Sequence, residues 1–436
     1  MKEKVEFYKE TEFGEFPKDW EVKMLSEIAI LERGLSYSSK EKSKDEIPDG
    51  YLFLTLNSIG EGGGLKECGW TWIKSERLRE RHFIKEGDIV IANTEQSKDG
   101  SLIGSPAIVH LPKWYKKDKA VFSMDLSKLL LKISNMDVNF LFYYLSFVQL
   151  LARKYHTGTN VWHLKIDSWA SDLLIPLPPL CEQQKIAEIL STIDETIQKT
   201  DEIIDKTESL KKGLMQEFFT KGIGHKEFKD TEIWKIPKEW NVANLGSIAK
   251  IYSGNIAPQE EKYFKNGKYP FIRVQHLTEL EEEKFPVSYD FINDYALSDL
   301  KLKLFKKGCI VFPKSGESIK LEKRAMLKED SCVVNHLAVI EPLYENIDNL
   351  FLFYYLCTIK TSNYLTETTM PSLNLSTISK FPVPLPSLIE QQKITSILST
   401  VDKKLDVLKQ EKVKLEKIKQ WFMDELLTGK IRVNVS

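Results

Sequence analysis

The chain has 436 residues, of which 42% are hydrophobic, and it carries 62 basic and 63 acidic side chains. This length exceeds one ordinary hydrophobic core and predicts about two to four domains. The balanced charge excludes a chain that is basic throughout, so any nucleic-acid surface must be local. The five cysteines lack metal-ligand spacing, and the chain has neither an apolar run of ~18 residues nor a signal-peptide core. We therefore expect a cytoplasmic protein with reduced cysteines, no metal site and no membrane partner.

The first 179 residues are predicted to form one domain. Short apolar stretches at 51–56, 88–92 and 102–110 are separated by Gly, Pro, Asn and Asp, which is typical of a twisted mixed sheet. An aromatic-rich segment, Phe140–Ala152, is long enough for a buried helix.

Residues 223–386 repeat this plan and predict a second domain. The segment KGCIVFP at 307–313 corresponds to EGDIVIA at 86–92, and FLFYYL occurs at both 140–145 and 351–356. Between these landmarks the two copies diverge strongly. We therefore expect two domains that share a fold but present different surfaces.

A long amphipathic segment follows each domain. Residues 175–194 (IPLPPLCEQQKIAEILSTID) return as 383–402 (VPLPSLIEQQKITSILSTVD) with 14 of 20 positions identical, so the chain is a tandem duplication. The prolines set the start of two predicted helices, 180–222 and 387–436.

Apolar residues recur along both helices at steps of three and four, as in the seam of a paired helix. The residues predicted to pack in this seam are Ile186, Leu190, Ile193, Ile197, Ile204, Leu214, Ile394, Leu398, Val401, Leu405, Leu408, Leu415 and Phe422. Leu210 and Ile418 extend the same pattern, whereas Thr200, Thr207 and Lys412 interrupt it.

Charge favours pairing of these two helices with each other. Residues 181–222 have a net charge of −3 and residues 389–436 a net charge of +3, which favours a pair of unlike helices over self-association. The alternative is two separate helices, each lying on its own domain. An antiparallel pair of about 40 residues would span about 60 Å. The predicted fold is therefore α+β, with two homologous α/β domains at opposite ends of an antiparallel pair of long helices, related by a pseudo-two-fold axis.

Two divergent domains, each followed by a Pro-rich lead into an EQQKI-x-x-IL-S-T-[IV]-D helix, resemble the specificity subunit of Type I restriction–modification enzymes. The resemblance covers the whole chain. It implies two target recognition domains that bind the halves of a bipartite double-stranded DNA site, with the helices as spacer. It also implies two modification subunits that dock on the helices and use S-adenosylmethionine, and a restriction or translocase subunit that uses ATP and Mg.

Catalytic motifs are missing from the sequence. It contains no NPPY-like methyltransferase motif and no glycine-rich phosphate loop. A PD…[DE]xK nuclease could start at Pro48-Asp49, but the next lysines, Lys66, Lys74 and Lys85, have no acidic residue two positions before them. The histidines form no HxxxH or HExxH pair. We therefore expect a non-catalytic chain without its own cofactor.

Candidate DNA contacts lie in loops at matching positions of the two copies. Affinity is expected from Lys and Arg on phosphates, and specificity from polar side chains on base edges. The candidates are Gln96, Ser97, Lys98, Thr159, Asn160, His163 and Lys165 in the first domain and Arg273, Gln275, Lys314, Ser315, Lys320, Arg324, Ser372 and Asn374 in the second. The same residue types also suit solvated loops and turns.

Two other functions fit the same sequence. One is a protein-binding scaffold in which the two domains bind proteins, and the other is a DNA-binding regulator that acts alone. A preference for particular duplex sequences in the presence of modification subunits would separate the specificity subunit from both.

Overall fold

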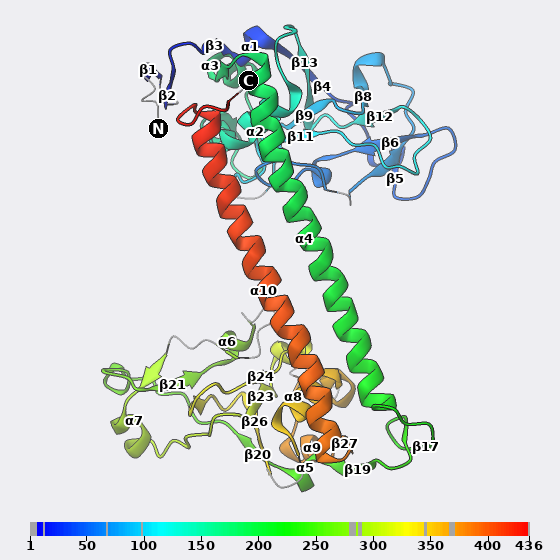
Figure 1. The fold of residues 1–436 in the computed structure, drawn as a ribbon, viewed down its shortest axis with the longest axis vertical. Coiled ribbons are helices and arrows are strands. Elements are labelled where there is room, and N and C mark those ends of the chain that lie inside the picture. Colours follow the sequence, from blue (N-terminus) through cyan, green and yellow to red (C-terminus); the bar gives the residue numbers. More distant parts are fainter. Residues whose placement is uncertain are drawn as a thin grey trace. The chain divides into compact units, whose positions relative to one another are not determined.

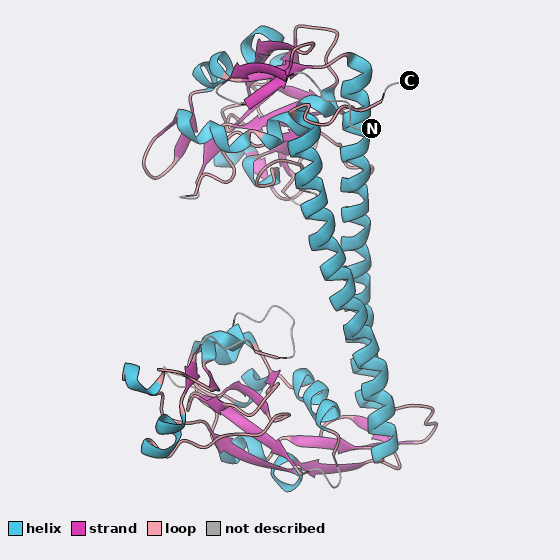
Figure 2. Ribbon diagram, turned by 60° about the vertical axis from the view of Figure 1, so that its left-hand side comes forward, coloured by secondary structure: helices cyan, strands magenta, loops and turns pink. Residues whose placement is uncertain are grey.

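The computed structural model describes residues 7–11, 14–66, 69–96, 99–278, 285–286, 290–343, 347–365 and 371–434. The chain divides into a first unit, Met1–Asp201 with Gln410–Ser436, and a second unit, Glu202–Lys409. Each unit therefore contains one copy of the duplicated domain and about half of each long helix. Strands and helices occur together in both units (Figure 2).

The first domain contains two main sheets. One is antiparallel, in the order β11-β9-β13-β4, and is built from β4 (Ala29–Arg33), β9 (Ile89–Ala92), β11 (Pro106–Ile108) and β13 (Leu126–Leu131). The other, in the order β5-β7-β6-β12-β8, is built from β5 (Lys42–Ser43), β6 (Tyr51–Leu54), β7 (Thr71–Ile73), β8 (Phe83–Lys85) and β12 (Lys119–Phe122). Strands β6 and β12 are parallel, so the sheet is mixed as predicted.

Three smaller sheets complete the described part of this domain. They are β1 (Phe7–Thr11) with β2 (Gly14–Pro17), β3 (Glu21–Met24) with β16 (Leu174–Leu177), and β10 (Thr94–Glu95) with β15 (Trp162–Leu164) and β14 (His156–Thr157). Strands β1, β2 and β3 are labelled in Figure 1. The helices are α1 (Leu25–Ile28), α2 (Val138–Phe147) and α3 (Ile166–Asp172). The Asp137 side chain caps α2 by accepting a hydrogen bond from the Phe140 N–H at 2.9 Å. This helix is apolar on most sides and is buried in the core, as its sequence predicts. It ends at Phe147, however, and most of the remainder of the predicted helix lies in a 3₁₀ helix, Gln149–Tyr155.

The second domain repeats this arrangement. Its antiparallel sheet, in the order β20-β26-β23-β24, is built from β20 (Ala249–Ser253), β23 (Ile310–Pro313), β24 (Ala325–Met326) and β26 (Leu337–Pro342). The mixed sheet contains β21 (Tyr269–Ile272), β22 (Phe291–Ile292) and β25 (Cys332–Val333), with β21 and β25 parallel. The remaining strands are β17 (Phe228–Asp230), β18 (Lys235–Pro237), β19 (Asn241–Asn244) and β27 (Pro382–Leu385).

The helices of the second domain are α5 (Leu245–Ile248), α6 (Val274–Thr278), α7 (Asp294–Asp299), α8 (Asn349–Thr358) and α9 (Leu375–Ser379). Three of them, α5, α8 and α9, have counterparts in α1, α2 and α3 of the first domain. Helix α8 carries the second FLFYYL and is capped by Asp348 in the way that Asp137 caps α2. The two copies differ in α6 and α7, which belong to the divergent part of the sequence.

Two long helices follow the domains (Figure 1). Helix α4 is Leu180–Lys221, with 42 residues, and α10 is Leu388–Leu427, with 40 residues. The prediction that the second helix extends to residue 436 is wrong. The helix stops before Gly429, whose φ of +72° is a left-handed conformation that favours glycine. Among the described residues, no helix combines the length and the apolar character that crossing a membrane requires.

The helices pair antiparallel within each unit through ion pairs between acidic and basic side chains. In the first unit Asp194 contacts Lys419 at 2.6 Å and Asp201 contacts Lys412 at 2.7 Å. In the second unit the pairs are Glu208–Lys409 at 3.1 Å and Lys211–Asp402 at 2.7 Å. These contacts confirm that the oppositely charged helices pair with each other.

The predicted seam residues are all buried or half-buried, but they do not all serve the seam. Ile186 and Leu190 belong to the core of the first domain, and Ile394 and Leu398 to that of the second. Leu210 and Ile418 are 55% and 44% exposed, so their assignment to the seam is wrong. A period of 3.6 rotates the apolar stripe away from the partner over many turns.

Two threonines that interrupt the apolar pattern are part of the buried surface. Thr200 and Thr207 are buried, and their hydroxyls donate to the carbonyls of Thr196 and Ile203 at 2.8 and 2.7 Å. The hydroxyls are therefore satisfied inside their own helix. Lys412, the third interruption, forms the ion pair with Asp201.

Candidate nucleic-acid interface

In the first domain, two loops that are far apart in the sequence lie side by side. The chain leaves β9 at Ala92 and enters β10, which pairs with β15 through Thr94↔His163 and Glu95↔Trp162. The Leu164 N–H donates to the Asn93 carbonyl at 2.8 Å. The two predicted contact segments, 93–101 and 156–167, therefore form one surface.

Exposed polar side chains lie on this surface. The predicted residues that are exposed are Gln96, Thr159, Asn160, His163 and Lys165. Amide side chains such as Gln and Asn can pair with an adenine edge, and lysine suits a phosphate. Ser97 and Lys98 lie outside the described residues.

The hairpin that presents Thr159 and Asn160 has a defined shape. Gly158 has a φ of +98°, and a Cβ there would lie 2.1 Å from the Val161 carbonyl oxygen, so the turn requires glycine. The His156 ring stacks on Trp162 with centroids 3.9 Å apart. These contacts hold the exposed tip on the rest of the hairpin.

Two side chains, Glu95 and Arg153, hold the first of these loops through hydrogen bonds to its backbone. Glu95 is buried, and one of its carboxylate oxygens accepts from the N–H groups of Leu102 and Ile103 at 2.6 and 3.2 Å. Arg153 donates from Nε to the Gly100 carbonyl at 3.1 Å. The loop is thus held by its own core contacts, which leaves Gln96 at the surface.

The equivalent loops of the second domain pair in the same way. Ser315 and Ser372 form a β-bridge, and the Leu373 N–H donates to the Lys314 carbonyl at 2.8 Å. Ser372 and Asn374 are exposed, and Lys314 and Ser315 are half-buried. Both domains therefore present a paired-loop surface at the same place with different residues.

Two further candidates in the second domain lie beside this surface. Helix α6, which carries Gln275 at an exposed position, packs against the short 3₁₀ helix Glu317–Leu321. Arg273 precedes α6, pairs with Asp290 and lies over the Phe271 ring at 5.3 Å. Lys320 is exposed and pairs with Glu317 at 2.6 Å.

Arg324 is a structural residue, and its assignment as a DNA contact is wrong. It is 7% exposed, and its guanidinium donates to Glu322 and to the Ile359 carbonyl at 2.8 and 2.7 Å. Burial alone would raise the pKa of Glu322. The Ser362 and Thr361 donors and Arg324 outweigh it and lower that pKa to about 2. The sequence could not show that this basic residue points inward.

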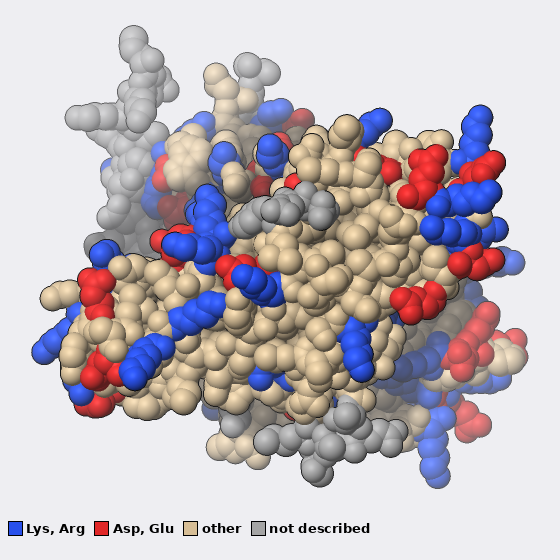
Figure 3. Space-filling model, turned by 90° about the horizontal axis from the view of Figure 1, so that it is seen from below, with Lys and Arg blue, Asp and Glu red and all other residues tan. Residues whose placement is uncertain are grey.

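On the face drawn in Figure 3, Lys and Arg side chains are interspersed with Asp and Glu. Among the described residues no cluster of His, Cys, Asp and Glu could hold a metal ion.

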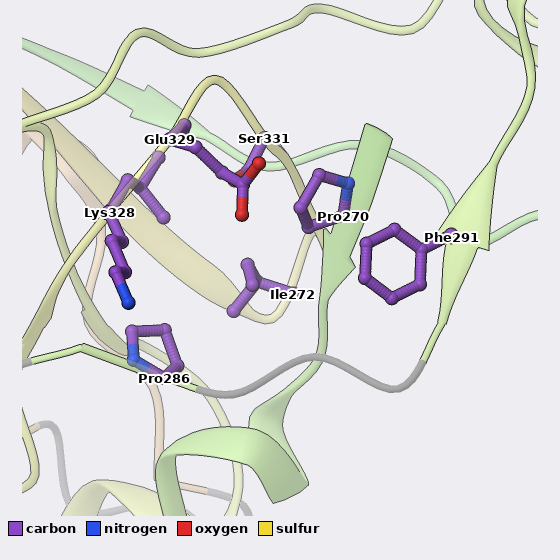
Figure 4. Close-up of a pocket in the computed structure, with 8 residues that line it drawn as sticks. Pro270, Ile272, Pro286, Phe291, Lys328, Glu329 and Ser331 are labelled. Atoms are coloured by element: carbon purple, nitrogen blue, oxygen red, sulfur yellow. The ribbon is translucent and has the colours of Figure 1, made fainter. Parts of the chain in front are cut away.

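Figure 4 shows a cavity of about 200 Å³ in the second unit, where Pro270, Ile272 and Phe291 meet Lys328 and Glu329. Ligand sites usually enclose ~300–1,000 Å³. Because none of the predicted DNA contacts lines this cavity, we assign it no part in the interface.

The repeated EQQKI segment attaches each long helix to its own domain, a role that the sequence prediction missed. Gln183 accepts the Asp137 N–H at 2.8 Å, and Gln391 accepts the Asp348 N–H at 2.8 Å. In both units this glutamine binds the first turn of the FLFYYL helix. The sequence did contain a signal for this role, because the polar residues of EQQKI are identical in two copies that otherwise diverge.

The glutamate of the same motif binds the domain and the residues beyond the other long helix. Glu182 accepts from Trp20 Nε1 at 3.3 Å and from Arg432 at 2.7 Å. Glu390 accepts from Trp240 Nε1 at 3.0 Å and contacts His225 at 2.9 Å. Each helix start is thus tied to the chain segment that follows the partner helix.

The fold and this surface define a duplicated, two-domain binding protein with one paired-loop surface per domain and a pair of long helices. The family model described as "Type I restriction modification DNA specificity domain" matches residues 17–209 and 237–417. The chain therefore belongs to the specificity subunits of Type I restriction–modification systems, and its two units contain the two target recognition domains.

Individual relatives agree with this assignment. The chain is 31% identical to the putative type I restriction enzyme MjaX specificity subunit of Methanocaldococcus jannaschii, over 99% of this chain and 98% of that one. It is 30% identical to the MjaVIII specificity subunit of the same organism, over 98% of each chain. The crystal structure of a Type I S subunit from M. genitalium, 17% identical, has the same fold with a TM-score of 0.56 over 94% of this chain and 96% of that one.

Proposed function

We propose that the chain is a non-catalytic subunit in which each target recognition domain contacts one half of a bipartite duplex DNA site. The observation that carries this proposal is the paired-loop surface, which occurs at the same place in both domains but carries different side chains. A shared scaffold with different contact residues suits two half-sites of different sequence.

The paired helices are proposed to set the number of base pairs between the half-sites. A helix of this length extends about 60 Å. Ion pairs join α4 and α10 within each unit.

The helices are also proposed to dock two modification subunits, which would supply S-adenosylmethionine. Several large apolar side chains of α4 and α10 remain exposed instead of packing, namely Ile203, Leu210, Val407, Val413, Ile418 and Trp421. Such residues on a helix surface suit a partner protein. In the same proposal a restriction subunit carries ATP and Mg.

Docking is tested by co-purification with the modification subunit. Trp421→Glu and Val407→Glu should each lower the amount that binds, since each places a charge at an exposed apolar position. Lys414→Glu, at an exposed polar position of the same helix, is the matched control. Equal binding by all three variants would refute docking on these faces.

DNA recognition is tested by sequencing methylated adenines in cells that express this chain with its modification partner. We expect one bipartite motif that disappears when the chain is omitted. Replacing residues 1–179 with those of a relative should change one half of the motif only. No motif, or a change in both halves, would contradict the proposal.

A further inference from the structure

Each unit contains a hydrogen-bonded network that joins three elements, a domain helix, the long helix that follows that domain, and the other long helix. We call these the Tyr–Asp–Lys networks; the first is Tyr143, Asp194 and Lys419, and the second is Tyr354, Asp402 and Lys211.

In the first network Tyr143 Oη donates to Asp194 Oδ2 at 2.8 Å, and Lys419 Nζ lies 2.6 Å from Asp194 Oδ1. In the second, Tyr354 Oη donates to Asp402 Oδ2 at 2.5 Å, and Lys211 Nζ lies 2.7 Å from Asp402 Oδ1. In each aspartate one oxygen therefore binds the domain and the other binds the partner helix. The aspartate couples the position of its domain to the register of the helix pair.

The two networks are related by the internal duplication. Asp194 and Lys211 of α4 recur 208 residues later as Asp402 and Lys419 of α10. The tyrosines are the fourth residues of the two FLFYYL segments, and both are buried. Burial and the neighbouring aspartate raise the pKa of both hydroxyls, so each tyrosine remains a hydrogen-bond donor.

The networks favour the native alignment of α10 along α4 over alignments shifted by one heptad, which the apolar seam alone would tolerate. A slide of α10 by one heptad along α4 turns its apolar face by only about 20°, so it is the slide that the apolar seam opposes least. In the slid registers, however, Asp402 would face Ile204 or Phe218 instead of Lys211. The Asp402 side chain is only 10% exposed, and a carboxylate at such a position is strongly disfavoured without its counter-ion.

We propose that the two Tyr–Asp–Lys networks are positioning groups that, together with the other ion pairs between α4 and α10, select one register of the helix pair, and with it one spacing between the DNA half-sites. This inference rests on the proposed function. A slide of one heptad is about 10 Å along the helix axis, which corresponds to about three base pairs at about 3.4 Å each.

The test uses the full chain with its modification partner on a library of DNA in which the two half-sites are separated by different numbers of base pairs. The measured quantity is the ratio of methylation at the native spacing to methylation at spacings three base pairs longer or shorter. We expect Asp194→Asn/Asp402→Asn to lower this ratio about tenfold, because both cross-helix ion pairs lose their charge. The sequences of the half-sites should not change.

Two further variants separate positioning from general stability. Tyr143→Phe/Tyr354→Phe removes only two hydroxyls and should lower the same ratio by about threefold, even if the asparagine variant does not fold. Asp205→Asn/Glu411→Gln removes two exposed charges from the same helices and should leave the ratio unchanged.

An unchanged ratio in the tyrosine variant, or an equal fall in the control, would overturn the inference while the proposed function stands. A wild-type chain that directs no bipartite methylation would refute the proposed function itself.

Discussion

Arg432 is predicted to be the most important single contact of the segment that follows α10. Its guanidinium makes four hydrogen bonds of 2.7 to 2.9 Å, two to Glu182 and two to Asp19. The Glu182 side chain is only 2% exposed, whereas Asp19 is 58% exposed. Arg432→Met keeps the aliphatic part of the side chain but leaves Glu182 buried without its cation.

The size of the effect follows from these exposures. Removing one partner of a buried ion pair costs about 3–5 kcal/mol. Because Arg432 is 29% exposed, water can solvate Glu182 in part once the guanidinium is gone. We therefore expect the free energy of unfolding of the first unit to fall by about 2–3 kcal/mol. The Asp19 half of the contact adds little, since an exposed pair contributes about 0–1 kcal/mol.

Hydrogen exchange measured by mass spectrometry can follow this loss locally, with peptides of the second unit as an internal reference. Residues 428–434 should exchange faster in Arg432→Met. Lys430→Met is the control, because Lys430 and its partner Asp424 are both about half exposed. Adding Glu182→Gln should restore part of the protection, since it removes the uncompensated charge. Equal effects of the Arg432 and Lys430 variants, or no recovery in the double variant, would refute this reasoning.

Three other measurements test separate parts of the structure. The pKa of Glu322 in the folded protein is about 2, below the ordinary 4.5. Its contribution to the free energy of unfolding is therefore complete above about pH 4.5 and is lost as the pH falls toward 2. Urea unfolding of the second unit should accordingly depend less on acid pH in Glu322→Gln. Lys314→Gln should weaken DNA binding and lower the slope of log affinity against log salt by about 0.9 if Lys314 contacts a phosphate, and an unchanged slope would argue against that contact. Deleting residues 200–206 and 408–414 together keeps both Tyr–Asp–Lys networks and should bring methylated half-sites about three base pairs closer, whereas an unchanged gap would contradict the spacer role of the helices.

The sequence alone determined the duplication, the starts of both long helices and their pairing. These features depend on local patterns, namely a verbatim repeat, prolines that begin a helix, apolar residues at helical spacing and opposite net charges. For the same reason the EQQKI segments alone indicate the family. Loops at matching positions of the two copies also predicted where polar side chains such as Gln96 and Asn374 reach the surface.

Only the tertiary structure decided which of these residues act together. The pairing of the loops at Thr94 and His163 joins segments that are far apart in the chain, and no local pattern encodes such a contact. Arg324 is a basic residue in a candidate DNA-binding loop, but it is buried against Glu322. Hydrogen bonds from the repeated EQQKI segment and from the aspartate of each network attach the long helices to the domains. These bonds matter because a buried polar group that loses its partner is costly.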